Sequence, residues 1–443
     1  METHIFSRHL GRRVERALAS SRVVNIVGPR QAGKTTLVRD LTRSSRYLTL
    51  DDDGVRAALE ADPLGQLQTL AQQTAASSLP VVIDEVQRAP GITLALKQIV
   101  DTNRRPGQYL LTGSSDIFSV GKAIDSLAGR VATLTLRPLS SAEIMGAGFC
   151  GLLETAAGNP QHILDHLPTP PAFRRSDAID MIVRGGFPEI RPLADVDRIH
   201  RYNSYIDSIV ERDVAPVAEV RKPDVLRRLI DQLAYTTAEE LNVTRLCSAL
   251  GARRETVSDY LDVLSKLGIV HRLGAWKSSG AGKDVKSPKL HFLDTGCATA
   301  LRGEDSGSFD IGAHPEALGH VLESFVYTEI EKSLPLLKKH WRLFHWRSQQ
   351  REIDIVAEAP GRLLALFEVK ASATVNAGDF RHIDWFLKDG PGQAYRGVGF
   401  VVYLGEQLLS FGQGRIAVPL SAFWSSPPGE TTVQPDKIVE GRS

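Results

Sequence analysis

The stretch VVNIVGPRQAGKTT, which spans Val23–Thr36, decides how the first part of the chain folds. Its mainly apolar, β-branched beginning predicts a buried strand, and the octapeptide that follows matches the pattern G-x-x-x-x-G-K-[ST]. Glycines at the two fixed positions let the backbone curl, so that successive N–H groups and a helix N-terminus point at one anion. A strand before the motif and a helix after it are the context in which this loop binds the phosphates of a nucleotide.

Within this loop, Lys34 is predicted to reach the β- and γ-phosphates and Thr35 to ligate Mg²⁺. A glycine-rich turn with an incidental lysine is the alternative interpretation of the octapeptide alone. The predicted nucleotide-binding residues are Gly28, Pro29, Arg30, Gln31, Ala32, Gly33, Lys34, Thr35, Thr36 and Asp84.

A second acidic motif follows downstream, where the apolar run Val81–Ile83 ends in Asp84 and Glu85. Asp84 is predicted to hold the magnesium shell, and Glu85 to polarise the water that attacks the γ-phosphate. Two solvated acids at a strand end are common in isolation, but here they accompany the phosphate loop. The two motifs, Walker A and Walker B, therefore predict an ATPase that binds ATP with Mg²⁺.

Two further groups are candidates for catalytic roles in this region. The strand candidate Tyr109–Leu111 ends in a polar turn, where Thr112 or Ser114 would sense the γ-phosphate between the two motifs. A Ser/Gly turn that only caps the strand is the alternative. Arg130 precedes the last strand of the region and is a candidate for charge stabilisation, in cis or across a subunit interface, unless it is simply a solvated arginine.

Length and composition limit the classes of protein that the chain can be. The 443 residues are too many for one ordinary core, and the contents of 42% hydrophobic and 24% charged residues are typical of folded globular domains. A formal net charge of +1 excludes a global field that attracts nucleic acid or membranes. Three dispersed cysteines and the lack of a long apolar run predict a cytoplasmic protein with free thiols.

Changes in pattern along the chain predict its domain organisation. Alternating short apolar runs and helical patterns predict a largely parallel α/β domain over 1–150, and a Gly- and Pro-rich linker or surface excursion over 151–176. Helical spacing predicts a small helical domain over 177–289, and renewed strand patterns predict a second α/β domain over 290–425. The polar tail over 426–443 is predicted to be disordered.

The middle segment ends in a pattern typical of a helix-turn-helix. Two helices, over Leu241–Ala252 and Arg253–Leu267, are joined by a turn at Gly251, and the polar stretch Lys277–Lys289 would be a hairpin tip or wing. Nine Lys and Arg against four Asp and Glu lie between Arg245 and Lys289. Such a patch is consistent with DNA contact, but winged helices also serve as protein-docking modules and as rigid lids. The candidate nucleic-acid contacts are Arg253, Arg254, Lys277, Lys283 and Lys286.

The C-terminal segment contains a possible nuclease constellation. Asp354 lies in one strand pattern, and Glu368 and Lys370 end the next, where strand alternation places both on one face. Asp354 and Glu368 would share Mg²⁺, Lys370 would orient or activate water, and Glu323 would add an acid from a helix over Leu318–Leu334. The alternatives are an ordinary surface strand of alternating charge and a retired nuclease fold that serves as a binding module.

Taken together, these motifs and the segment Gly185–Glu189 resemble the prokaryotic AAA-type P-loop ATPases that carry a C-terminal DUF4143 domain. The resemblance covers about residues 15 to 420. It implies an AAA-type ATPase core, a winged-helix-like middle domain and a C-terminal restriction-endonuclease-like α/β domain. It also implies self-assembly, because AAA-type sites are often completed by a neighbouring subunit.

Three functional hypotheses follow from these predictions. The first is an ATPase that couples Mg-ATP hydrolysis to a conformational change of a nuclease-like domain acting on or sensing nucleic acid. The second is an ATP-regulated switch with an inactive nuclease-like domain. The third is a toxin-like or defence effector whose target is not nucleic acid.

Overall fold

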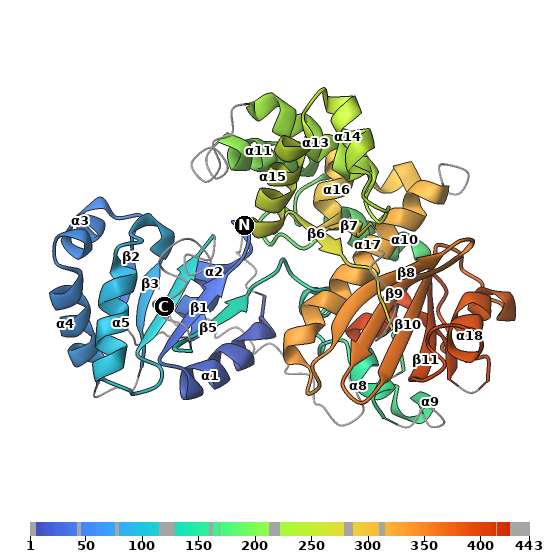
Figure 1. The fold of residues 1–443 in the computed structure, drawn as a ribbon, viewed down its shortest axis with the longest axis horizontal. Helices are drawn as coiled ribbons and strands as arrows, with labels where there is room; N and C mark the ends of the chain where they lie inside the picture. The colour runs from blue at the N-terminus through green and yellow to red at the C-terminus, as the bar shows by residue number, and fades with distance from the viewer. Residues whose placement is uncertain are drawn as a thin grey trace, which may run out of the picture. The chain divides into compact units, whose positions relative to one another are not determined.

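The computed structural model describes residues 6–41, 46–75, 79–114, 129–158, 163–167, 169–211, 222–278, 287–309, 315–412 and 414–425. They form two compact units, each with its own sheet (Figure 1). The P-loop unit comprises Arg8–Pro138 and Lys266–Gly268. The C-terminal unit comprises the described residues of Leu139–Ser265 and of Ile269–Ser425, together with Phe6 and Ser7.

A parallel sheet of five strands, in the order β2-β3-β4-β1-β5, forms the centre of the P-loop unit. The strands are β1 (Val23–Val27), β2 (Tyr47–Thr49), β3 (Val81–Asp84), β4 (Tyr109–Gly113) and β5 (Val131–Thr135). All five were predicted, with ends that differ by at most two residues, as Val23–Val27, Tyr47–Leu50, Val81–Ile83, Tyr109–Leu111 and Val131–Leu136. Because β4 lies between β1 and β3, the ends of these three strands meet at one edge of the sheet.

Helices cover both faces of this sheet, because alternate strand residues point to opposite sides. Val24 and Ile26 pack with α1 (Leu10–Ser20) and α2 (Lys34–Leu41), whereas Val23 belongs to a different apolar cluster. That second cluster includes side chains of α3 (Asp53–Ala61), α4 (Pro63–Ala75) and α5 (Ile92–Thr102). The sheet is therefore buried on both sides.

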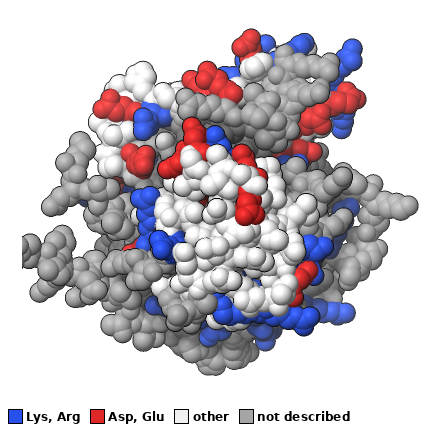
Figure 2. All heavy atoms as spheres, turned by 90° about the vertical axis from the view of Figure 1, so that its left-hand side faces the viewer, with Lys and Arg blue, Asp and Glu red and all other residues white. Residues whose placement is uncertain are grey.

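The outer surface of the P-loop unit shows little charge in its middle. Uncharged residues gather there, and Lys, Arg, Asp and Glu lie around them (Figure 2). The helix α4 carries no charged residue. The described part of this face is thus unlike the basic surfaces that bind nucleic acid.

A mixed sheet in the order β12-β13-β11-β10-β9-β8 forms the centre of the C-terminal unit. The strands are β8 (Arg342–Ser348), β9 (Arg351–Ala359), β10 (Leu363–Lys370), β11 (Arg396–Tyr403), β12 (Leu409–Ser410) and β13 (Arg415–Pro419). Of the four strands predicted after residue 289, three correspond to β9, β10 and β11, and the one at Leu290–Leu293 corresponds to β7 (Lys289–Phe292) outside this sheet; β8, β12 and β13 were not predicted. Neither was α18 (Arg381–Lys388), which covers one face and packs beside β9 and β11.

Helices from the middle of the chain pack in the same unit. Those of eight or more residues are α10 (Arg175–Arg184), α11 (Asp195–Ile209), α13 (Pro223–Tyr235), α14 (Val243–Leu250), α15 (Arg254–Lys266) and α17 (Pro315–Ser333), and the shorter α16 (Thr295–Leu301) contacts four of them. An antiparallel pair, β6 (Val270–Leu273) and β7 (Lys289–Phe292), follows α15.

The structure groups the middle and C-terminal residues differently from the predicted domains. Ile182 of α10, Val326 of α17 and Phe367 of β10 belong to one apolar cluster, so the segments 177–289 and 290–425 share a core. The unit boundary falls between Pro138 and Leu139 rather than near residue 150. The predicted tail 426–443 lies outside the described residues. Among the helices that the structure describes, none is both long and apolar enough to cross a bilayer.

Candidate functional site

The phosphate loop connects β1 to α2 through a backbone that only glycine permits at its first position. A Cβ placed on Gly28 would lie 2.1 Å from the carbonyl oxygen of Leu136. Gln31 and Gly33 both have positive φ, of 60° and 94°. These angles curl the loop over the N-terminus of α2, which is the geometry that binds phosphate oxygens.

The ammonium of Lys34 lies inside this loop. Lys34 is 5% exposed, and its Nζ donates hydrogen bonds of 2.9 Å to the carbonyl oxygens of Gly28 and Pro29. The positive charge is thus held against the part of the backbone that cradles phosphate in this motif.

Asp84 accepts hydrogen bonds from hydroxyl groups of three neighbouring segments. Its carboxylate accepts hydrogen bonds from Thr35 of α2 (2.9 Å), Tyr47 of β2 and Thr112 of β4. Burial and the bond to Asp84 raise the pKa of Tyr47 to about 12, so the phenol stays protonated and donates. Thr35, Asp84 and Thr112 were predicted as site residues. Tyr47 was missed, because its role depends on the pairing of β2 with β3.

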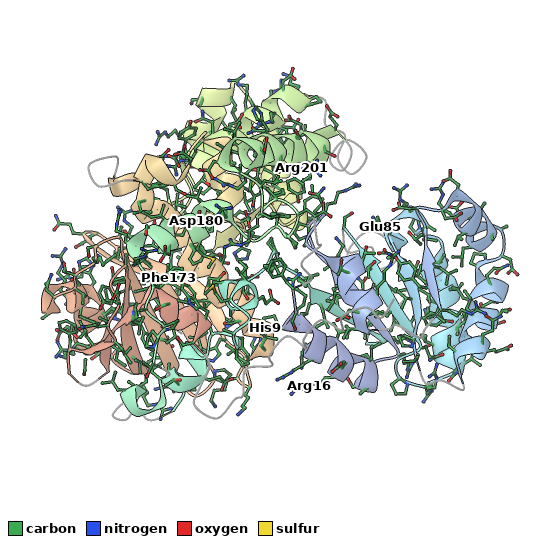
Figure 3. The ribbon with its side chains drawn as sticks, turned by 180° about the vertical axis from the view of Figure 1, so that it is seen from behind. His9, Arg16, Glu85, Phe173, Asp180 and Arg201 are labelled. Carbon is green, nitrogen blue, oxygen red and sulfur yellow. The ribbon has the colours of Figure 1, made fainter. Side chains whose placement is uncertain are left out.

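Glu85, which is labelled in Figure 3, follows β3 directly. Its backbone is left-handed, with φ of 58°. The side-chain amide of Gln87 donates to the Glu85 carboxylate and, at 3.2 Å, to Ser114 Oγ. Gln87 therefore links two residues that were predicted separately. No motif points to it, although it stands only two positions after Glu85.

Arg8 is a further residue near the phosphate loop that sequence reasoning missed. Its guanidinium donates to the carbonyl oxygens of Ala32 and Arg137, each at 2.6 Å. Arg8 precedes α1, far from the motif in sequence, so no local pattern places it beside the loop. It adds a positive charge next to the predicted phosphate position.

Arg130 lies at the opposite edge of the same sheet. The backbone N–H of Val23, the first residue of β1, donates to the Arg130 carbonyl oxygen at 3.2 Å. The guanidinium forms two hydrogen bonds with Asp101, one of them 3.2 Å long. Because the phosphate loop follows the other end of β1, Arg130 cannot contact a nucleotide bound to its own chain. The part of the prediction that allowed action in cis is therefore not supported by the geometry.

The predicted helix-turn-helix corresponds to α14 and α15, joined at Gly251 with φ of 62°. Arg253 and Arg254 are exposed at the start of α15, and Lys277 is exposed after β6. Lys283 and Lys286 lie outside the described residues. The described arginines are thus accessible to a partner.

A cluster of charged side chains lies where β7, α17 and β9 meet in the C-terminal unit. At its centre is Lys289, which is only 2% exposed. Its Nζ lies 2.7 Å from Glu323 Oε1, 2.6 Å from Glu352 Oε1 and 3.6 Å from Asp354 Oδ1. We call these four residues the lysine–carboxylate cluster.

The other two predicted nuclease residues lie next to this cluster. Glu368 Oε2 is 3.6 Å from Lys370 Nζ, and its Oε1 is 3.9 Å from His382 Nδ1. Asp354 accepts a 2.9 Å hydrogen bond from the backbone N–H of Val369. Burial raises the pKa of Glu368, and the charge of Asp354 raises it further.

Burial and the excess of carboxyl groups together decide the protonation of the cluster. Burial raises the pKa of Glu323 to about 8, against the attraction of Lys289. Burial acts to lower the pKa of Lys289, but Glu323, Asp354 and Glu352 outweigh it and the pKa is raised. One ammonium therefore faces three carboxyl groups, of which Glu323 carries a proton near neutral pH.

Glu323, Asp354, Glu368 and Lys370 thus lie in one region, as predicted, but Lys289 and Glu352 were not predicted. Lys289 was placed in an exposed wing, whereas it begins a strand that is buried along its whole length. Within the described ranges, no group of three or more His, Cys, Asp or Glu side chains is placed to hold a metal ion.

Three families match successive parts of the chain. Residues 20–145 match the family described as AAA domain, residues 175–308 match a domain of unknown function (DUF8612), and residues 318–423 match a domain of unknown function (DUF4143).

Similar proteins cover most of the chain. An uncharacterized protein of Mycobacterium tuberculosis is 31% identical over 371 residues, which are 83% of this chain and 74% of that protein. An uncharacterized protein of Haemophilus influenzae is 22% identical over 76% of this chain and 80% of its own length. A solved Walker-type ATPase of Pyrococcus abyssi aligns with a TM-score of 0.43 at 13% identity, over 67% of this chain and 96% of that one.

Proposed function

Because the chain belongs to the family of AAA-type P-loop ATPases with a C-terminal DUF4143 domain, we propose that it binds ATP with Mg²⁺ and hydrolyses it. The observation that carries this proposal is the bond of 2.9 Å between the Thr35 hydroxyl and Asp84. An oxygen pair from the phosphate loop and the acidic strand is the donor set that Mg²⁺ prefers beside a nucleotide. The residues present therefore fit the ion that the family implies.

Each residue of the site has a distinct role in this proposal. Lys34 exchanges its bonds to the Gly28 and Pro29 carbonyls for bonds to the β- and γ-phosphates. Thr35 and Asp84 would hold Mg²⁺, which when bound would neutralise charge on the phosphates. Glu85 accepts a proton from the attacking water, and Gln87, which also donates to Ser114, holds the Glu85 carboxylate in place.

Two substitutions separate binding from hydrolysis. Lys34→Ala removes the cation at the phosphates, so we expect ATP affinity and hydrolysis to be lost together. Glu85→Gln keeps the cation and the fold, so we expect ATP binding to persist while turnover falls by about 10²-fold or more. Phosphate release and binding of a fluorescent ATP analogue measure the two effects.

The matched control is Glu60→Gln, which makes the same change at an exposed position of α3. It should hydrolyse ATP like the wild type. Wild-type turnover in Glu85→Gln would instead show that Glu85 is not the group that polarises water.

We propose that the ATPase works in the cytoplasm and that its cycle changes the conformation of the C-terminal unit. A specific observation favours nucleic acid as what that unit senses. Arg253 and Arg254 are exposed at the first turn of α15, which is the part of a second helix that enters the groove in helix-turn-helix proteins. A purely regulatory switch would not need exposed arginines at the N-terminus of this helix.

Salt dependence tests this proposal. Phosphate contacts release counterions, so duplex affinity should fall steeply with salt, and each lost contact should reduce the log–log slope by about 0.9. We expect the double change Arg253→Gln and Arg254→Gln to reduce this slope. Replacing the exposed Arg201 of α11 by glutamine should leave the slope unaltered. Fluorescence anisotropy with labelled duplex DNA measures both. Absence of binding by the wild type at low salt would assign α15 to a structural or protein-contact role.

A further inference from the structure

The lysine–carboxylate cluster brings oxygens from separate elements to one point. Glu323 comes from α17, and Glu352 and Asp354 come from β9. In a restriction-endonuclease-like domain, carboxylates gathered in this way hold a divalent metal ion. Here the ammonium of Lys289 lies at that point, within 2.7 Å of two carboxylate oxygens.

A metal ion does not fit the same position. Mg²⁺ and Ca²⁺ need oxygen ligands at about 2.0–2.6 Å, and an ammonium already in contact with those oxygens excludes a second cation by sterics and by charge. The position is not closed to solvent, because the cluster lines a cavity of about 590 Å³. A cation could therefore enter from water, but Lys289 occupies the place where it would bind.

The backbone on both sides holds Lys289 in this place. It pairs with Leu273 of β6 and forms a bridge with Glu240 on its other side. The next residue, Leu290, exchanges backbone hydrogen bonds of 3.0 and 2.7 Å with Glu239 and Ala238. Lys289 is thus fixed in the fold and is not a surface lysine that has folded inward.

We propose that Lys289 is a built-in replacement for a metal ion among Glu323, Glu352 and Asp354, so that these three carboxyl groups are held together without a divalent cation. The ammonium ties β7 to α17 by a hydrogen bond to Glu323, and to β9 by ion pairs with Glu352 and Asp354. The same pairs leave the carboxylates without a metal-bound water to deliver to a phosphodiester. The cluster is therefore a structural clamp rather than a metal-dependent nuclease site.

Mn²⁺ binding by the nucleotide-free, full-length wild type tests this proposal first. We expect Asp354→Asn to leave the number of Mn²⁺ ions bound per chain unchanged, as counted by electron paramagnetic resonance of free Mn²⁺. A Mn²⁺ site in the wild type that Asp354→Asn abolishes would overturn the proposal. So would Mn²⁺-dependent cleavage of labelled DNA that is lost in the same variant.

Removal of the lysine tests the same point from the other direction. Lys289→Met leaves three carboxyl groups facing one another, which lowers the unfolding midpoint, and we expect Mn²⁺ to bind there and to raise that midpoint again. All five tryptophans lie in the C-terminal unit, so their fluorescence follows its unfolding.

The matched control is Lys332→Met, which removes a half-buried lysine bonded to Glu329 at 2.9 Å. With a single carboxylate there, Mn²⁺ should not restore its midpoint. A folded Lys289→Met protein that gains neither Mn²⁺ nor stability from Mn²⁺ would contradict the proposal. If Lys289→Met does not fold, the comparison of the wild type with Asp354→Asn decides the question alone.

Discussion

Asp84 shows how much of the nucleotide site depends on side chains outside the motifs. Its motif position predicts a magnesium-shell carboxylate, and Thr35 was predicted from the phosphate loop. The hydroxyl of Tyr47 reaches the same carboxylate only because β2 pairs with β3, and that pairing cannot be read from either strand alone. Residues in a motif or directly after a predicted strand were therefore predicted, whereas Tyr47, which no motif marks, was not.

Lys289 illustrates the same limit in the C-terminal unit. In the sequence it ends the polar stretch from Lys277, so its charge indicates an exposed position. Three carboxyl groups from α17 and β9 stabilise that charge in a buried position. Counting charges along the sequence therefore placed Lys289 in an exposed basic patch, although the folded chain buries it against carboxyl groups.

The proton held by Glu323 makes the stability of the C-terminal unit depend on pH. The pKa of about 8 in the folded chain lies above the ordinary value of 4.5, so the folded state binds a proton that the unfolded chain releases. The stabilisation of the folded state by this proton is fully present below pH 4.5 and is lost as the pH rises to about 8.

Glu323→Gln should remove that dependence, because an amide of similar shape does not titrate in this range. As the pH rises from 5 to 8, we expect the free energy of unfolding of the wild type to fall relative to that of the variant. Urea unfolding followed by tryptophan fluorescence at several pH values measures it. Parallel curves for the two proteins would contradict a raised pKa for Glu323.

At the scale of elements, the two edge strands of the sheet in the C-terminal unit, β8 and β12, were not predicted, whereas three of its four inner strands were. β10 reads Leu-Leu-Ala-Leu-Phe, as expected for a central strand. β8 reads Arg-Leu-Phe-His-Trp-Arg-Ser at a sheet edge, and β12 has only two residues. Edge strands bury less apolar surface, so their pattern is weaker, although they complete the same sheet.

The packing of α16 gives a prediction at this scale. Replacing a helical glycine by alanine usually stabilises a helix by about 1 kcal/mol. At Gly296 of α16, however, a Cβ would lie 2.7 Å from the backbone nitrogen of Gly185 and 2.8 Å from the carbonyl carbon of Arg184. We expect Gly296→Ala to destabilise the C-terminal unit by about 1–3 kcal/mol, because backbone must move.

Gly319→Ala in α17 is the matched control, since a Cβ there meets no atom within 4 Å. It should leave stability unchanged or raise it by up to about 1 kcal/mol. Urea unfolding curves of the two variants measure the contrast. Equal stabilisation by both would show that α16 and the end of α10 do not pack as closely as described.

At the scale of the whole molecule, the chain divides differently from its sequence segments. The linker predicted over 151–176 suggested a first boundary near residue 150, yet the first segment of the P-loop unit ends at Pro138, and the unit also includes Lys266–Gly268 at the C-terminal end of α15. The chain therefore passes between the two units more than once. Composition shifts mark irregular segments, but they do not show which segments share a core.

The position of Arg130 leads to a prediction about self-assembly. It lies at the edge of the sheet opposite the phosphate loop, so any action on ATP must be on a nucleotide bound to a neighbouring chain. We predict that ATP promotes self-assembly and that Arg130→Ala lowers hydrolysis by about 10³-fold, the size typical of an arginine supplied in trans, without lowering ATP affinity. Light scattering and phosphate release measure the two effects.

Asp101→Asn separates this role from a structural one, because it breaks the Arg130–Asp101 ion pair but keeps the arginine. If Arg130 only holds Asp101, both substitutions should have the same effect, and partly exposed ion pairs contribute little to stability. If Arg130 acts on a neighbouring chain, Asp101→Asn should retain hydrolysis that Arg130→Ala loses. A wild type that stays monomeric at every ATP concentration, yet hydrolyses ATP at the same rate per chain at all protein concentrations, would exclude the role in trans. Because Arg130 cannot contact a nucleotide bound to its own chain, Arg130 would then have no part in the reaction.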